Sequence, residues 1–310
     1  MTTLLYLSIC AAGITFVAAS AARAVRYARS PLHLRWELYP VPHEEPQRVA
    51  HGGSYFEGSE WWTAPRHFNL AGELRVMIPE MLFLEALRKS NRALWYRSFP
   101  FHFGLYLLAG SAGLLLLAAF AVVLGGGLPG GPFGSVLRWL AATTGIVGLV
   151  LSFCGACALL QRRLSEPSLR SYTTVGDIFN LAFFVAVLGL IGVGYAVRPD
   201  GSPGALVIAT GLLSWDSTLH VPGALAAGLF AGAALTAYIP LTHMSHFVGK
   251  YFTYHAVRWD DTPLAADPRM TAKLAEYLTY RPTWSAAHIR TNESGTWADV
   301  VSSNPGEAHR

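Results

Sequence analysis

Long apolar stretches separated by short charged segments dominate the sequence. A bilayer-spanning α-helix needs about 20 mostly apolar residues, and five stretches have that length. They cover about residues 3–24, 100–125, 136–160, 175–197 and 222–249. The pattern predicts an all-α, polytopic membrane bundle with five transmembrane helices.

Composition supports a membrane protein. Of the 310 residues, 52% are hydrophobic and 14% are charged, which is too few charges for a soluble chain of this length. The formal net charge is +4. We attribute this excess to the uneven placement of Lys and Arg around the spans rather than to nucleic-acid binding.

Positive charge also predicts the orientation, because Lys and Arg collect in cytoplasmic segments next to spans. The first span is followed by Arg23, Arg26 and Arg29, and no Lys or Arg precedes it, so we expect an uncleaved helix rather than a signal peptide. Candidate outer loops contain only Arg138 and Arg198. The predicted topology is N-out/C-in.

The chain divides into four predicted parts. They are a first transmembrane helix (1–26), a cytoplasmic loop with an interfacial amphipathic helix (27–98), a four-helix haem-binding membrane core (99–250) and a cytoplasmic C-terminal tail (251–310). We expect the amphipathic helix at about 79–95.

The tail has its own helix signal. Asp267-Pro268 is an N-cap residue followed by proline, which predicts a helix running towards Tyr280. We expect the last twenty or so residues to be poorly ordered without a partner.

Three histidines are the chief candidates for chemistry, because ionisable residues inside spans are costly. His102 lies near the predicted inner end of the second span, and His243 and His246 lie near the inner end of the fifth. Antiparallel neighbours would bring His102 and a histidine of the fifth span to one depth, as in bis-histidine haem ligation. The alternative is histidines that bond only water or backbone.

Glycines and cysteines in the spans have two interpretations each. Gly104, Gly228 and Gly232 would let a macrocycle approach closely, but the small-residue spacing is also that of ordinary helix packing. Cys154 and Cys157 have the CxxC spacing of redox and zinc sites without a second pair. We interpret both cysteines as small packing residues.

A family resemblance sharpens the haem hypothesis. Residues 161–178, Gln-Arg-Arg-Leu-Ser-Glu-Pro-Ser-Leu-Arg-Ser-Tyr-Thr-Thr-Val-Gly-Asp-Ile, resemble the connection between the third and fourth helices of the respiratory nitrate reductase gamma subunit, a quinol-oxidising cytochrome b. The similarity extends to Phe101-His102-Phe-Gly104 and to Pro240 followed by His246. It covers about residues 99–250.

The resemblance implies which residues bind haem. In that family two haems are bound, and His102 and His246 match the pair that holds the haem nearer the cytoplasm. The positions matching the outer pair are Ala112 and Gly228, so one haem b is expected. The predicted cofactor-binding set consists of His102, His246, Gly104, Gly232, His243 and Arg97.

The long first loop points to one branch of this superfamily. Its segments Trp36-Glu-Leu-Tyr-Pro and Arg97-Ser-Phe-Pro-Phe-His102 resemble membrane cytochromes of anaerobes such as sulfate reducers. In that branch the cytochrome pairs with a cytoplasmic iron–sulfur subunit similar to heterodisulfide reductase. The resemblance implies menaquinone as substrate, a bacterial or archaeal cytoplasmic membrane, and a complex that can include further membrane or periplasmic cytochrome c subunits.

Other roles remain open for two residues. His243 stands where the family usually has Lys or Arg, and could contact a haem propionate or a quinone, or serve as an alternative ligand. Asp177 could handle protons at a quinone, but Thr174-x-x-Asp177 is also a capping box. The alternative for the whole chain is a haemless anchor for a soluble redox enzyme. A transporter is disfavoured because no paired broken helices are visible.

Overall fold

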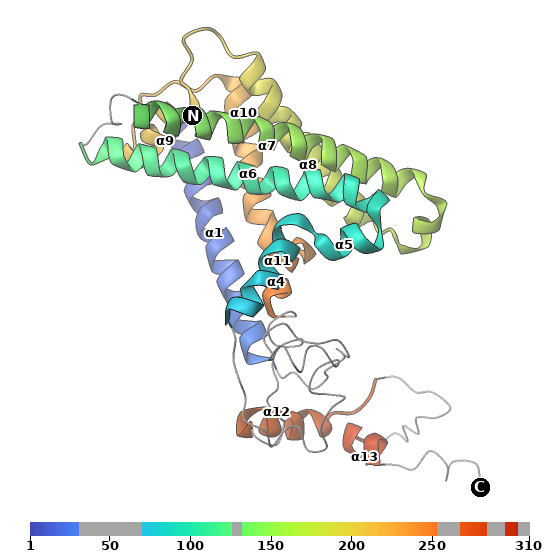
Figure 1. Ribbon diagram of the computed structural model, residues 1–310. Helices are drawn as coiled ribbons and strands as arrows, with labels where there is room; N and C mark the ends of the chain where they lie inside the picture. The colour runs from blue at the N-terminus through green and yellow to red at the C-terminus, as the bar shows by residue number, and fades with distance from the viewer. Residues whose placement is uncertain (31–69, 126–131, 253–266, 284–294, 303–310) are drawn as a thin grey trace. The chain divides into compact units, whose positions relative to one another are not determined.

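A computed structural model describes residues 1–30, 70–125, 132–252, 267–283 and 295–302 (Figure 1). Within these ranges all regular secondary structure is helical. The predicted all-α class is therefore confirmed. The proline-punctuated segment from Trp36 and the aromatic residues Trp61 and Trp62 lie outside the described residues.

Five helices are long and apolar enough to cross a membrane, as the hydrophobic pattern predicted. The protein is a multi-pass membrane protein. The five spans are α1 (Thr2–Arg29), α6 (Arg92–Val123), α7 (Pro132–Ser165), α8 (Val175–Ala196) and α10 (Gly223–Tyr238) with its 3₁₀ extension η3 (Ile239–Leu241).

One apolar helix was not predicted. α9 (Ala205–Ser214) is only 10 residues long, so its apolar run is too short to register as a span. It ends at Trp215, which adopts the left-handed conformation with φ 57°.

The chain forms two compact units. The first combines Met1–Ala22 with Met77–His246, and it holds most of each of the five spans. The second combines Arg23–Val76 with Phe247–Arg310. The histidines discussed below all belong to the first unit.

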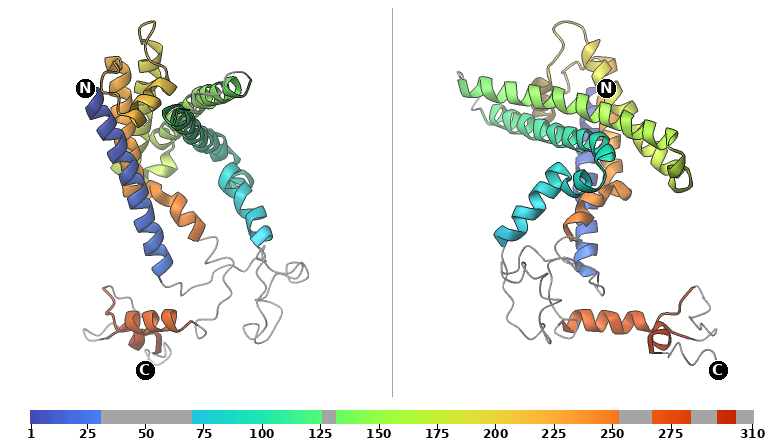
Figure 2. Two further views of the ribbon diagram at one scale, coloured as in Figure 1. Left: turned by 90° about the vertical axis from the view of Figure 1, so that its left-hand side faces the viewer. Right: turned by 45° about the vertical axis from the view of Figure 1, so that its right-hand side comes forward.

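Small residues bring α6 and α7 into backbone contact. The two helices lie side by side over much of their lengths (Figure 1 and Figure 2). A methyl group on Gly155 would lie 2.5 Å from the backbone nitrogen of Phe101, and one on Gly104 would lie 2.5 Å from the backbone nitrogen of Ser152. This is the small-residue packing of membrane helices, where close approach replaces a hydrophobic driving force.

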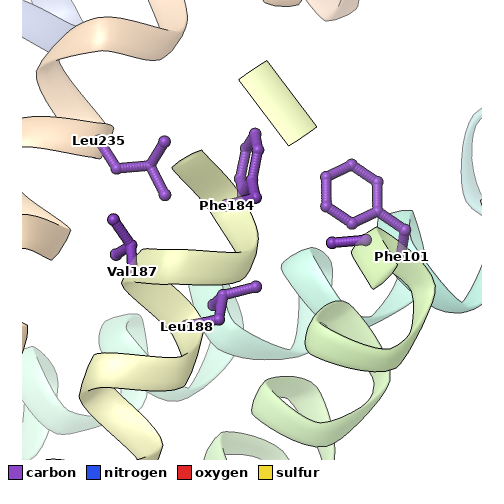
Figure 3. Packing of buried hydrophobic residues seen from close by; sticks show 6 residues of the cluster. Phe101, Phe184, Val187, Leu188 and Leu235 are labelled. Carbon is purple, nitrogen blue, oxygen red and sulfur yellow. The ribbon is translucent and has the colours of Figure 1, made fainter. Parts of the chain in front are cut away.

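Buried aromatic and aliphatic side chains join α8 to its neighbours. Figure 3 shows Phe184, Val187 and Leu188 of α8 between Leu235 of α10 and Phe101 of α6. The rings of Phe101 and Phe184 meet edge to face, with centroids 4.9 Å apart. Phe101 precedes His102, so this contact helps to fix the position of that histidine.

A second cluster packs the start of α1 against α9 and α10. Leu5, Ile208, Val221, Leu225 and Ala226 are buried together. The hydroxyl of Thr2 donates to the carbonyl of Leu219 over 2.7 Å. The first helix is therefore an integral part of the membrane bundle.

The single amphipathic helix expected at 79–95 was wrong. The segment forms α4 (Leu70–Phe83), α5 (Glu85–Ser90) and the first turn of α6. Leu84 takes a left-handed backbone with φ 51°, and the buried Glu80 carboxylate accepts from the Ala86 amide over 2.7 Å. A second break follows because the Asn91 side chain accepts from the Leu94 amide, capping α6.

The fifth predicted span is also not continuous. α10 ends at Tyr238 and is followed by η3, then η4 (His243–Ser245), then α11 (His246–Phe252). Pro240 lacks the amide hydrogen that would continue the helix. Thr242 and Ser245 bond the released backbone, Thr242 accepting from the Met244 amide and Ser245 donating to the Thr242 carbonyl.

The tail helix was predicted correctly. α12 spans Pro268–Leu278, and the Asp267 carboxylate accepts from the amides of Arg269 and Met270. The expectation of a poorly ordered last twenty residues was wrong for α13 (Trp297–Ser302), and residues 303–310 lie outside the described part of the chain. Thr296 and Asp299 exchange side-chain to backbone hydrogen bonds at its start.

Candidate functional site

His102 and His246, far apart in sequence, have neighbouring rings in the first unit. Their ring centroids are 6.0 Å apart and the ring planes make an angle of 69°. His102 lies on α6, and His246 begins α11 just after the broken end of α10. The tertiary structure thus brings together the two histidines that the family resemblance selected.

The separation between these rings can be compared with bis-imidazole coordination. A metal–imidazole bond is about 2 Å long and each ring nitrogen lies about 1.1 Å from its ring centre, so two rings on opposite sides of one iron have centres roughly 6 Å apart. Each ring can turn about its iron–nitrogen bond. The observed separation of 6.0 Å agrees with this value, so His102 and His246 are the residues that would hold a haem iron.

A hydrogen bond fixes the tautomer of His102. Its Nδ1 lies 2.8 Å from the carbonyl oxygen of Ser98, and a carbonyl can only accept, so Nδ1 carries the proton. The lone pair is then on Nε2. Metal-binding histidines characteristically donate their other ring N–H to a carbonyl or carboxylate in this way.

The local structure holds His246 differently. Its backbone amide donates to the carbonyl of His243, which anchors it at the junction of η4 and α11. His246 is exposed, whereas His102 is half-buried and Ser98 beside it is buried. The pair therefore lies at the edge of the helical packing, where a large planar group can reach it.

His243 and His246 have different side-chain contacts, although they are only three residues apart. The Nε2 atom of His243 lies 3.2 Å from the amide nitrogen of Asn180 on α8, whereas the ring of His246 lies beside the ring of His102. The backbone links the two histidines, because the His243 carbonyl accepts from the His246 amide.

A polar chain connects α8 to the end of α10. The Tyr238 hydroxyl donates to Oδ1 of Asn180 over 2.7 Å. With its oxygen turned to Tyr238, the Asn180 amide presents its nitrogen to His243, so Nε2 of His243 accepts and Nδ1 carries the proton. The Asn180 side chain is buried, with an exposed fraction of 5%.

Asp177 serves as the helix cap that the sequence indicated. Its carboxylate accepts from the amide of Thr174 over 2.9 Å, and the Thr174 hydroxyl accepts from the Asp177 amide. The carboxylate sits in the first turn of α8, where the helix dipole stabilises negative charge. Its Oδ1 also lies 3.8 Å from Nε2 of His243.

Three aromatic rings pack together, and one of them, Tyr238, belongs to this polar chain. Phe179, Phe183 and Tyr238 have pairwise centroid distances of 5.6 to 5.9 Å. Phe179 is exposed, and the other two are half-buried. Polar atoms next to a flat apolar surface are typical of small-molecule binding sites.

The glycines pack helices in this structure. Gly104 contacts α7, and a methyl group on Gly232 would lie 3.3 Å from the side chain of Ile191 on α8. Arg97 donates to the carbonyl of Ala93 within its own helix. A cofactor contact for Arg97 or the two glycines stays a prediction.

The two positions that match the family's outer haem ligands are Ala112 and Gly228, and neither is a histidine. A methyl group on Gly228 would lie 3.0 Å from backbone atoms of Ile191, so a histidine there would have to separate α8 from α10. Ala112 is exposed and His220 precedes α10 in a loop. The expectation of one haem stays a prediction.

Three residues that bond in this site were not predicted from the sequence. Ser98 stands four residues before His102, and Asn180 stands three residues after Asp177 in an otherwise apolar span. Tyr238 is five residues before His243. A buried amide in a span was the available signal, but the partners of Asn180 depend on helix pairing that the sequence does not display.

Comparison with known proteins adds no relative: no family model, curated protein or solved structure matches the chain. Within the described part of the chain, no group of three or more His, Cys, Asp or Glu side chains could hold a metal ion. Cys154 and Cys157 on α7 are free thiols. The two-histidine pair is therefore the arrangement that carries the functional argument.

Proposed function

We propose that this chain is the membrane cytochrome b subunit of a respiratory electron-transfer complex. It would pass electrons between menaquinone or menaquinol and a cytoplasmic iron–sulfur partner, through one haem b that His102 and His246 would hold. The observation that carries the proposal is the 6.0 Å separation of these two rings. The sequence resemblance to the nitrate reductase gamma subunit supplies the quinone and the partner.

The residues present suit a low-spin haem. The Ser98 carbonyl holds His102 with Nε2 as its basic nitrogen, which sets the ring for coordination. Bound haem would supply one-electron chemistry, while the protein sets its position and potential. Quinol oxidation releases two electrons and two protons, so the iron–sulfur partner must accept the two electrons in succession.

The setting that we propose is the cytoplasmic membrane of a bacterium or archaeon, with the C-terminal tail inside. The connection between α7 and α8 carries Arg162, Arg163 and Arg170, whereas the ends at the other side carry Arg138 and Arg198. This charge difference supports the N-out/C-in orientation.

The first test is haem content. The protein purified in detergent should contain one b-type haem per chain in a pyridine haemochrome assay, with a low-spin α-band on reduction. The reason is that the structure places one pair of histidines, His102 and His246, with ring centroids 6.0 Å apart. Two haems per chain would contradict the single-site assignment, and none would favour the haemless anchor.

A further inference from the structure

The buried Asn180 amide is an unusual polar group for a membrane span. Both of its polar atoms are engaged, with Tyr238 donating to the oxygen and His243 accepting from the nitrogen. Polar side chains inside spans are costly and mark ligand or ion sites by default. This chain is separate from the Ser98–His102 bond that orients the proposed haem ligand.

The polar chain ends on an accessible ring. The side chain of His243 is 67% exposed, although its Nε2 is held by Asn180. When Nε2 accepts this bond in the neutral ring, the proton is on Nδ1, which offers a hydrogen-bond donor.

The surroundings define the chemistry of a ligand at this place. The rings of Phe179, Phe183 and Tyr238 supply flat apolar contact surface for another ring. The Asp177 carboxylate, 3.8 Å from His243 Nε2, disfavours an anion such as a haem propionate or a lipid phosphate. The site suits a neutral, planar, apolar ring with hydrogen-bond-accepting oxygens.

We propose that Asn180 and His243, with Tyr238 positioning the amide, bind the head group of a quinone that enters from the lipid. This inference rests on the proposed function. The His243 carbonyl accepts from the His246 backbone amide, so one turn of backbone links the proposed quinone site to the proposed haem ligand.

The test uses the full-length protein in lipid nanodiscs. Asn180→Leu removes the amide, and Tyr238→Phe removes a single hydroxyl and so serves if Asn180→Leu does not fold. Thr236→Val is the matched control, because Thr236 is exposed on the same helix as Tyr238 and bonds only the Gly232 carbonyl of its own helix. Separate samples of each variant are reduced with dithionite or with a soluble menaquinol analogue, and KM for the analogue is measured in steady state with ferricyanide as the electron acceptor.

We expect both site variants to retain wild-type haem content and dithionite-reduced spectra. For the quinol analogue, KM should rise about tenfold, which corresponds to one lost hydrogen bond. A photoreactive azidonaphthoquinone should label the wild-type and Thr236→Val proteins within residues 175–196 or 238–250. The same labelling should fall strongly in Asn180→Leu.

Distinct results overturn the two proposals. Unchanged KM and labelling in both site variants, or labelling elsewhere in the chain, would place the quinone away from Asn180. Loss of haem in both variants would give these residues a structural role instead. If wild-type haem reduces with dithionite but never with the quinol analogue, or if the wild type holds no haem, the proposed function itself fails.

Discussion

His102, His246 and His243 occupy different surroundings, and this difference predicts different effects of substitution. The ring centroids of His102 and His246 are 6.0 Å apart, whereas His243 bonds Asn180. His102→Ala or His246→Ala should abolish the low-spin bis-histidine spectrum, because one axial ligand is lost. His243→Ala should leave that spectrum largely intact. Optical and electron paramagnetic resonance spectra of the purified variants provide the measurement.

The control for these substitutions is His220→Ala, which removes an exposed histidine in the loop before α10. Its spectrum should match the wild type. A haem lost in His243→Ala but retained in His246→Ala would reverse the ligand assignment on the fifth span.

At the scale of helices, the close contact between α6 and α7 predicts the stability of the region that positions Phe101 and His102. A methyl group on Gly155 would meet the Phe101 backbone at 2.5 Å. Gly155→Ala should therefore cost about 1–3 kcal/mol through overpacking, reduced by up to about 1 kcal/mol from the higher helix propensity of alanine. Thermal unfolding in detergent, followed by circular dichroism and haem absorbance, should show a lower midpoint.

Gly113→Ala is the matched control on α6, because nothing lies within 4 Å of the added methyl group. Its midpoint should equal or slightly exceed that of the wild type. Equal stability of the Gly155→Ala and wild-type proteins would mean that α6 and α7 separate without cost, and the backbone contact would then not hold Phe101 and His102 in place.

For the whole molecule, the distribution of positive charge predicts where the tail lies. A green fluorescent protein fused after Arg310 should fluoresce, and alkaline phosphatase fused at the same point should be inactive, because both results require a cytoplasmic C-terminus. Fusions after Gly201, in the turn between α8 and α9, should give the opposite pattern. The reverse result at both points would invert the topology and place the proposed haem near the outer surface.

Partner docking is also a property of the whole complex. The predicted cytoplasmic loop is too long for a simple connection, and its Trp36, Tyr39, Trp61 and Trp62 have the composition of an interface core. These residues lie outside the described part of the chain, and the alternative is an ordinary aromatic belt at the membrane surface. Deleting residues 44–72 should leave the haem spectrum intact but abolish co-purification of the iron–sulfur partner.

The matched comparison for this deletion is removal of residues 303–310, beyond α13, which should leave partner recovery unchanged if the loop carries the docking surface. Undiminished recovery of the partner after loss of 44–72, with a normal haem spectrum, would show that docking occurs elsewhere.

The sequence alone determined the five spans, the cap of α8 by Thr174 and Asp177, and the N-terminus of α12 at Asp267. These features depend on the length of apolar runs and on hydrogen bonds between residues two or three positions apart, so local sequence is sufficient to predict them. The site was predicted in part, because the resemblance selected His102 and His246 without their separation.

Only the tertiary structure decided how these local features combine. The breaks at Leu84 and after Tyr238 depend on the carboxylate of Glu80 and on polar groups that bond released backbone, and they override the helical period of the sequence. The partners of Asn180 come from residues 58 and 63 positions away. Such contacts depend on which helices pair and at what depth, and a periodic apolar pattern leaves both choices open.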